Sequence, residues 1–265
     1  MIQLDLKNKL AFVGGSTQGI GKAAALELAA RGANVVLIAR NEPRLLTSRE
    51  SLDTSQGQTH AYIIADHSEP EQVQERVLQY CQQEKLKEAH ILINNSGGPA
   101  PGAIFDADPD DFRMAYEQHL IVNQLLVQTL TPLMKQAQYG RIINIISTSV
   151  KEPIAGLGVS NTTRWAVAAW AKTLAQELAP FGITVNNILP GFIKTGRLDS
   201  LIENRAQKAG VSREEMEQQL ISMVPAGRLG ETNEIGAAIA FLASPAASYI
   251  NGINLPVDGG KTRNL

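Results

Sequence analysis

The segment Gly15-Ser-Thr-Gln-Gly-Ile-Gly21 is the first place in the chain where residue types and spacing suit a chemical task. It follows a short apolar run and precedes an amphipathic stretch. Glycines permit a tight turn between a strand and a helix. The helix N-terminus then offers free N–H groups and positive dipole character to a pyrophosphate. Because the context is correct on both sides, we predict a nicotinamide dinucleotide bound by Gly15, Ser16, Gly19, Ile20 and Gly21.

The residues after the next apolar run bear on the type of dinucleotide. An acidic side chain at that position binds a ribose 2′-hydroxyl, whereas an arginine accommodates a 2′-phosphate. This chain has Arg40-Asn41 there and no acid. We therefore predict NADP rather than NAD. The alternative is that Arg40 is only a surface charge.

The elements that must position these residues alternate along the chain. Short β-branched runs, apolar throughout, alternate with helical periodicity, as in a parallel sheet covered on both faces. We predict a doubly wound α/β fold of the Rossmann type, with a seven-stranded parallel sheet, in a single domain over residues 1–265. The predicted strands are Leu10–Gly14, Asn34–Ala39, Ala61–Ala65, His90–Asn94, Arg141–Ile146, Ile183–Ile188 and Ile253–Val257. The predicted helices are Ile20–Arg31, Glu69–Glu84, Asp110–Gln136, Thr162–Leu178 and Thr232–Ala243.

One segment, residues 192–223, breaks this alternation. It is long, helical in composition and rich in Glu, Gln and Arg. It follows the sixth predicted strand, at the carboxyl edge where such sheets bind ligands. We interpret it as a mobile lid over a substrate pocket. The alternative is a solvated helical insertion.

Composition narrows the classes of partner. The formal net charge is −2, with 44% hydrophobic and 19% charged residues. This balance gives no broad attraction to nucleic acid or to an anionic membrane, so we expect a small-molecule partner. Cys81 is the only cysteine, which excludes an intramolecular disulfide and a thiolate metal cluster. We expect a cytoplasmic protein, because the N-terminal residues lack the apolar core of a signal peptide and no apolar run is long enough to cross a bilayer.

Several motifs, in order, give the chain a family resemblance. It resembles a short-chain dehydrogenase/reductase of the 3-oxoacyl-[acyl-carrier-protein] reductase group, over residues 6–260. The glycine segment resembles that family's TGxxxGxG signature, with Gly14 where threonine is usual. Further similar positions are Asp66 beside the adenine, Asn94-Asn95-Ser96-Gly97 (the NNAG element), the catalytic serine Ser147, Pro190, Gly191 and Thr195 near the nicotinamide, and the last strand Leu255–Gly260.

The resemblance implies hydride transfer between NAD(P)H and a carbonyl. It extends the predicted cofactor site to Arg40, Asp66, His67, Asn95, Gly97, Pro190, Gly191, Ile193 and Thr195. In the family, a serine holds the carbonyl oxygen and a tyrosine donates the proton. A lysine four residues later binds ribose, and an asparagine supports a water relay. Members of the family also commonly form tetramers through two long helices, so the resemblance implies a homotetramer or homodimer.

Three of the four catalytic positions depart from this pattern. The tyrosine position, thirteen residues after Ser147, is Ser160; the lysine position is Arg164; and the asparagine position is His119. Ser160 and Arg164 remain an i, i+4 pair on one helix face. Arg164 keeps a positive charge for ribose hydroxyls but does not deprotonate in proteins. Ser160 is shorter and far less acidic than a phenol.

His119 places a group that titrates near neutral pH at a relay position. We hypothesise that His119, through a water, supplies the proton that tyrosine normally gives. The alternative is that His119 only caps or packs within its helix. The predicted catalytic residues are thus Ser147, Ser160, Arg164 and His119.

Two readings of function follow. The first is an NADP(H)-dependent oxidoreductase acting on a carbonyl or alcohol with a non-standard proton donor. The second is a dinucleotide-binding sensor or structural subunit with little or no turnover, which Ser160 in place of tyrosine favours. We predict no metal site, because the four histidines are scattered and Asp106, Asp108, Asp110 and Asp111 suit N-capping and solvation instead.

Overall fold

Seven parallel strands form one sheet in residues 4–264, the part of the chain that the computed structural model describes. The strand order is β3-β2-β1-β4-β5-β6-β7, which is the doubly wound arrangement that the sequence predicts. The order reverses between β1 and β4, where such sheets bind ligands at the carboxyl ends of the strands. The strands are β1 (Leu10–Gly14), β2 (Asn34–Ala39), β3 (His60–Ile64), β4 (Ile91–Asn94), β5 (Gly140–Ile145), β6 (Ile183–Pro190) and β7 (Asn254–Val257).

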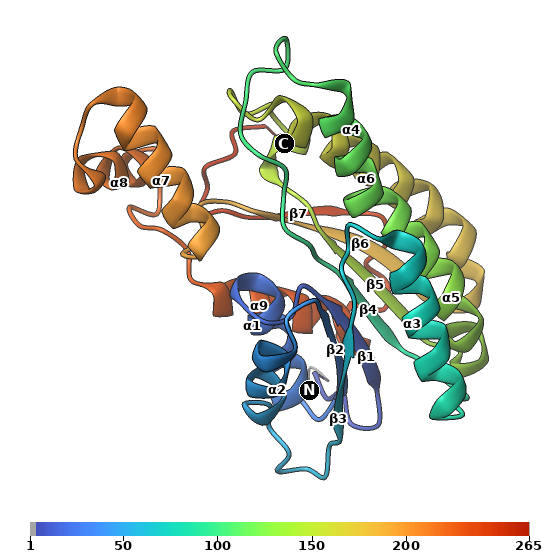
Figure 1. Ribbon diagram of the computed structural model, residues 1–265. Helices are drawn as coiled ribbons and strands as arrows, with labels where there is room; N and C mark the ends of the chain where they lie inside the picture. Colours follow the sequence, from blue (N-terminus) through green and yellow to red (C-terminus); the bar gives the residue numbers. More distant parts are fainter. Residues whose placement is uncertain (1–3, 265) are drawn as a thin grey trace.

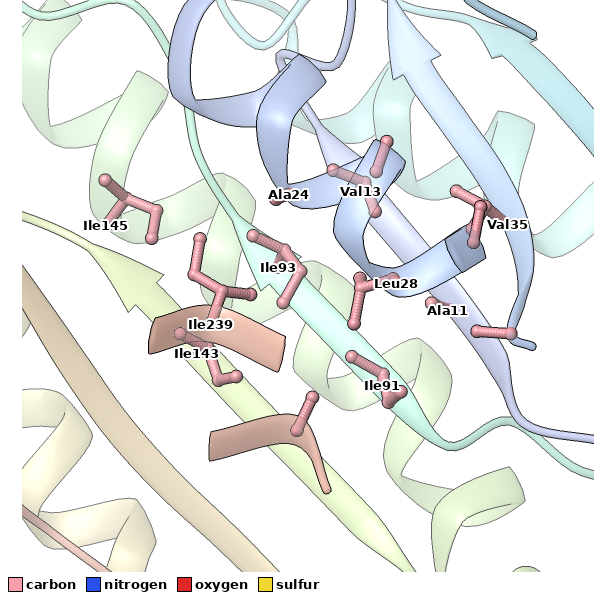
Figure 2. Close-up of a cluster of buried hydrophobic side chains, with 14 of the residues drawn as sticks. Ala11, Val13, Ala24, Leu28, Val35, Ile91, Ile93, Ile143, Ile145 and Ile239 are labelled. Atoms are coloured by element: carbon pink, nitrogen blue, oxygen red, sulfur yellow. The ribbon is translucent and has the colours of Figure 1, made fainter. Parts of the chain in front are cut away.

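Helices cover both faces of the sheet (Figure 1). On one face, α1 (Gly19–Ala30) packs against α9 (Thr232–Ala243). The other face carries α3 (Pro70–Gln83), α5 (Val122–Ala137) and α6 (Gly158–Leu178). Figure 2 shows the first of these layers. Branched side chains of β1, β4 and β5, among them Val13, Ile93 and Ile143, lie against Leu28 of α1 and Ile239 of α9.

A row of asparagines crosses the four neighbouring strands β4 to β7. Asn94, Asn144, Asn187 and Asn254 are in register, and each side-chain amide donates to the next carbonyl at 2.8 Å. Buried amides are costly unless they are hydrogen-bonded, so the row fixes the relative register of β4 to β7. Asn94 and Asn144 lie at the carboxyl ends of β4 and β5, directly before the segments that carry Asn95 and Ser147.

The predicted helical stretch Asp110–Gln136 is present, but a π-helical turn interrupts its regular α-helical hydrogen bonding. Helix α4 (Pro109–Tyr116) is followed by a π-helical turn, Glu117–Ile121, and then by α5. A π-turn inserts one extra residue into the helical ladder and is frequent at functional sites. His119 lies inside this turn.

Other boundaries moved by a few residues, and one helix was not predicted. Helix α2 (Glu42–Glu50) is short and polar. The sequence feature that indicates its start is the N-cap residue Asn41, whose side-chain oxygen accepts from the Arg44 N–H at 3.0 Å. Helix α6 begins at Gly158 rather than at Thr162, which places Ser160 in its first turn.

The predicted lid segment forms two helices, α7 (Gly196–Ala209) and α8 (Arg213–Ser222). They stand to one side of the sheet and its covering helices (Figure 1). They pack on one another through a small apolar cluster that includes Leu198, Ile202, Met216 and Leu220. The start of α7 lines the main cavity, as a lid over a pocket requires. Whether the segment moves stays a prediction.

Candidate active site

The glycine turn between β1 and α1 has no room for side chains. A Cβ on Gly21 would lie 2.2 Å from the Gly15 carbonyl oxygen, and Gly15 and Gly19 have φ values of +56° and +53°. Only glycine tolerates this combination of close approach and positive φ. Helix α1 begins here without a side-chain cap and without an acid in its first turn. Its N–H groups are therefore available to an anion.

Asn95 and His67 complete the wall of this turn. The Asn95 side-chain amide donates to the Gly14 carbonyl at 3.1 Å, which ties the end of β4 to the glycine turn. A Cβ on Gly14 would lie 2.8 Å from His67 Nε2, so the imidazole occupies the space that a larger residue at position 14 would need. Burial lowers the pKa of His67 to about 4. The ring is therefore neutral at physiological pH.

Arg40 and Asp66 form an ion pair where β2 and β3 end. The Arg40 guanidinium lies 3.2 Å from the Asp66 carboxylate, and the arginine side chain is 79% exposed. Burial raises the pKa of Asp66, but hydrogen bonds from Ser68 and Arg40 outweigh this effect and leave the pKa below its usual value. The pair is neutral overall and places an exposed guanidinium at this end of the cavity.

Ser147, Ser160 and Arg164 lie together on the opposite side of the strand-order reversal, beside β5 and α6. Ser147 Oγ accepts from the Ser149 N–H at 3.0 Å, which leaves its own hydroxyl proton free to donate. Arg164 is buried and donates to the Ile145 carbonyl at 3.0 Å. Burial, followed by the charge of Arg197, lowers the pKa of Arg164 to about 10. The guanidinium remains charged at neutral pH.

His119 is buried and does not itself line the cavity. Its Nδ1 lies 2.7 Å from Ser96 Oγ, and Ser96 does line the cavity. Within residues 4–264, His119 Nε2 has no hydrogen-bond partner. Burial, then Arg164, Arg197 and His67, hold the pKa of His119 well below its usual value. At neutral pH the imidazole is thus uncharged and reaches the cavity only through Ser96.

A cavity of about 550 Å³ joins these groups. Most of the predicted site residues line it, and they are Gly15, Gly19, Ile20, Arg40, Asp66, His67, Asn95, Gly97, Ser147, Ser160, Arg164, Pro190, Gly191, Ile193 and Thr195. Ser16, Gly21 and His119 do not line it. Ser16 Oγ instead donates to the Ile38 carbonyl at 3.3 Å, and Gly21 allows helix α1 to approach the turn.

The structure adds residues that the sequence reasoning did not identify. Arg197, in the first turn of α7, donates to the Gly98 and Pro99 carbonyls at 2.9 and 3.1 Å. A positive charge in the first turn of a helix interacts unfavourably with the helix dipole. This unfavourable position is the sequence feature that could have indicated a role for Arg197 in the site. Ser96 had no signal of its own, because its role depends on His119 in a distant helix.

Residues 15–262 match the family model described as enoyl-(acyl carrier protein) reductase. The NADPH-dependent reductase BacG of Bacillus subtilis is 32% identical over 260 residues, covering 98% of this chain and all of the relative. The 3-oxoacyl-[acyl-carrier-protein] reductase FabG of Haemophilus influenzae is 34% identical, covering 96% of this chain and 98% of the relative. The solved L-sorbose reductase of Gluconobacter frateurii, in complex with NADPH and L-sorbose, has a TM-score of 0.92. It is 29% identical, over 99% of this chain and all of that one.

The chain belongs to the short-chain dehydrogenase/reductase family, as the motifs predict. Its fold is the α/β fold of that family's oxidoreductases. In residues 4–264, no helix is long and apolar enough to cross a membrane.

Proposed function

We propose that this protein is an NADP(H)-dependent oxidoreductase that reduces a small carbonyl compound, or oxidises the corresponding alcohol, without the usual proton donor. The observation that carries the proposal is that one cavity joins the open N-terminus of α1 to Ser147, Ser160 and Arg164. A dinucleotide-binding subunit without turnover would need only the first of these features. The relatives whose names include NADPH support the same choice.

The residues present fit an NADP cofactor. The glycine turn leaves a cradle that a Cβ would fill, and α1 offers uncapped N–H groups beside it. Arg40 supplies a cation for a 2′-phosphate, and Asp66, His67 and Asn95 form the adjoining wall. The Arg164 guanidinium would bind ribose hydroxyls, as the family's lysine does. When bound, this cofactor donates or accepts a hydride.

The chain's own residues then act on the substrate oxygen. As the C–H bond forms, the π electrons of the carbonyl move to oxygen, which must take up a proton. Ser147 can donate to that oxygen, because its lone pair already accepts from the Ser149 N–H. The nearby positive charge of Arg164 stabilises the developing negative charge without giving up a proton.

We propose that the proton comes from a cavity water held between Ser160 and Ser96, and that the hydroxide left behind is reprotonated by solvent water that enters the cavity. His119 then acts as a positioning residue, because it contacts Ser96 and not the cavity. In this proposal His119 still takes part in the proton relay, by orienting Ser96. His119 does not need to be protonated for this role, and burial together with the charges of Arg164 and Arg197 disfavours its protonated form.

The test is binding and consumption of NADPH by the purified protein. We expect NADPH fluorescence to change on mixing, and a screen of ketones, imines and enones to find substrates that consume it. Ser147→Ala should lower kcat by about 10²- to 10³-fold with little change in NADPH affinity. Thr162→Ala removes an exposed hydroxyl from α6 and should leave kcat unchanged. Tight NADPH binding with no consumption across the screen would establish the alternative, a dinucleotide-binding subunit.

We also propose a homodimer or homotetramer built on the face of α4 and α6, in a reducing compartment such as the cytoplasm. Met114 and Trp165 on these helices are 61% and 49% exposed. The Trp165 indole N–H already donates to the Ser149 carbonyl at 2.9 Å. The exposed part of its ring can therefore pack against a second subunit without leaving a polar group unpaired. Sedimentation equilibrium tests the association. A monomer at all concentrations would refute it.

A further inference from the structure

Arg197 spans the cavity from the lid to the loop after β4. Its guanidinium donates one hydrogen bond from each Nη, to Gly98 and to Pro99. A guanidinium carries five N–H donors, so three remain for a ligand. The residue lines the cavity and stays accessible from it. Its placement in the first turn of α7 works against the helix dipole, which indicates a use other than helix stability.

Arg197 and Arg164 face the same part of the cavity without a carboxylate to balance them. In the described residues, no Asp or Glu lies within salt-bridge distance of either guanidinium. They are close enough for the charge of Arg197 to lower the pKa of Arg164. Among residues 4–264, the one acid that lines the cavity is Asp66, which is paired with Arg40 at the β2–β3 end. Lys261 adds a further cation to the lining.

Two neighbouring arginines without a carboxylate, one of them buried, repel one another, and a ligand that brings negative charge would relieve this repulsion. On the proposed function, Arg164 is committed to the ribose hydroxyls of the cofactor, which carry no charge. Arg197 belongs to the lid helix α7. The part of this helix that lines the cavity is mixed, with apolar Leu198 and Leu201 beside polar Ser200 and Asn204.

We propose that the substrate carries a carboxylate, bound by Arg197. The free edge of the Arg197 guanidinium matches the two oxygens of a carboxylate, and the cavity, lined by apolar and uncharged polar side chains, accepts the rest of the molecule. The Gly98 and Pro99 carbonyls hold the guanidinium in place, so little side-chain freedom is lost on binding. This inference rests on the proposed function for the reacting group and names the substrate class.

The test compares keto acids with their methyl esters as NADPH-consuming substrates: acetoacetate, levulinate and 4-oxocyclohexanecarboxylate. We expect kcat/KM to favour the acid over its ester by roughly 10- to 100-fold in at least one pair. Arg197→Gln should remove this preference, mainly through KM, and Arg197→Lys should keep part of it. NADPH affinity should not change. Lys208→Gln removes the same charge from an exposed position on α7 and should behave as wild type.

Calorimetry on the NADP⁺-saturated protein separates this inference from the proposed function. If neither these pairs nor any compound in the wider screen of ketones, imines and enones consumes NADPH, the reductase proposal fails, yet binding of the acids can still be measured. Acid binding that is lost in Arg197→Gln and kept in Lys208→Gln supports the carboxylate site. No acid binding, equal binding of acid and ester, or a preference that survives Arg197→Gln would overturn it. Thermal unfolding of each variant verifies that it is folded.

Discussion

The Ser96 hydroxyl lies 2.7 Å from His119 Nδ1 and connects a buried imidazole to the cavity. The two residues come from different elements, the end of β4 and a π-turn between two helices. If the hydroxyl donates to the Gln118 carbonyl, 3.2 Å away, then Nδ1–H donates to the hydroxyl oxygen. The neutral histidine can therefore orient Ser96 without carrying a charge.

His119→Ala should lower kcat by about 10-fold or more and leave NADPH affinity unchanged, because the relay loses its positioning group. The wild-type rate should show no His119 inflection between pH 6 and 8, since burial and nearby cations depress the pKa of this residue. Steady-state pH profiles measure this. Ser96→Ala should cause a similar loss, and the double variant should lose little more than either single variant.

A different profile would contradict positioning by a neutral ring. If His119 acted as an imidazolium donor, the wild-type rate would fall steadily as pH rises above its pKa. That slope would then disappear in His119→Ala.

Ser160→Tyr should increase ketone reduction by about 10- to 100-fold if proton delivery limits the rate. The phenol would extend from the first turn of α6 into the cavity, where the charge of Arg164 lowers its pKa toward a useful range. NADPH consumption with a ketone measures the effect, and Thr162→Tyr on the exposed side of α6 is the control. No gain, with NADPH affinity intact, would mean that another step limits the rate.

Arg40→Gln should weaken NADPH binding by about 10-fold and leave NADH binding unchanged. A charge-assisted contact to a phosphate contributes about 1.5–3 kcal/mol, and exposure of this side chain to solvent places it at the low end. Fluorescence titrations with both cofactors measure the ratio. Arg49→Gln on α2 is a control, because Arg49 does not line the cavity. An equal loss for both cofactors would contradict a 2′-phosphate contact.

The free energy of unfolding should fall as pH drops from 6.5 to 4, in part through His90. His90 Nδ1 accepts the Leu10 N–H at 3.1 Å, and burial, aided by Lys9, lowers the pKa of His90 to about 4. In this interval the unfolded chain binds a proton that the native state does not. The loss approaches about 3 kcal/mol, at about 1.4 kcal/mol per pH unit.

His90→Asn keeps an acceptor for Leu10 without a titrating group. Urea unfolding across this pH range should give a shallower slope for the variant, while the two proteins keep the same stability difference above pH 7. A slope equal to that of wild type would exclude His90 as a contributor.

The sequence by itself determined the fold class, the turn and most of the cavity lining. These features depend on local rules: apolar runs buried on both faces, glycines that a tight turn requires, and a helix start beside them. The positions of Ser147, Ser160 and Arg164 followed from spacing within one family pattern, and the cavity brings them together.

Only the tertiary structure decided what surrounds those residues. His119 is separated from the cavity by Ser96, a contact between residues 23 positions apart that depends on where the π-turn falls. Arg197 reaches the loop after β4, across 99 positions, and Gly14 faces His67. Charge balance and burial are sums over such distant neighbours. No local pattern encodes them, so they emerge only when the sheet and its helices are assembled.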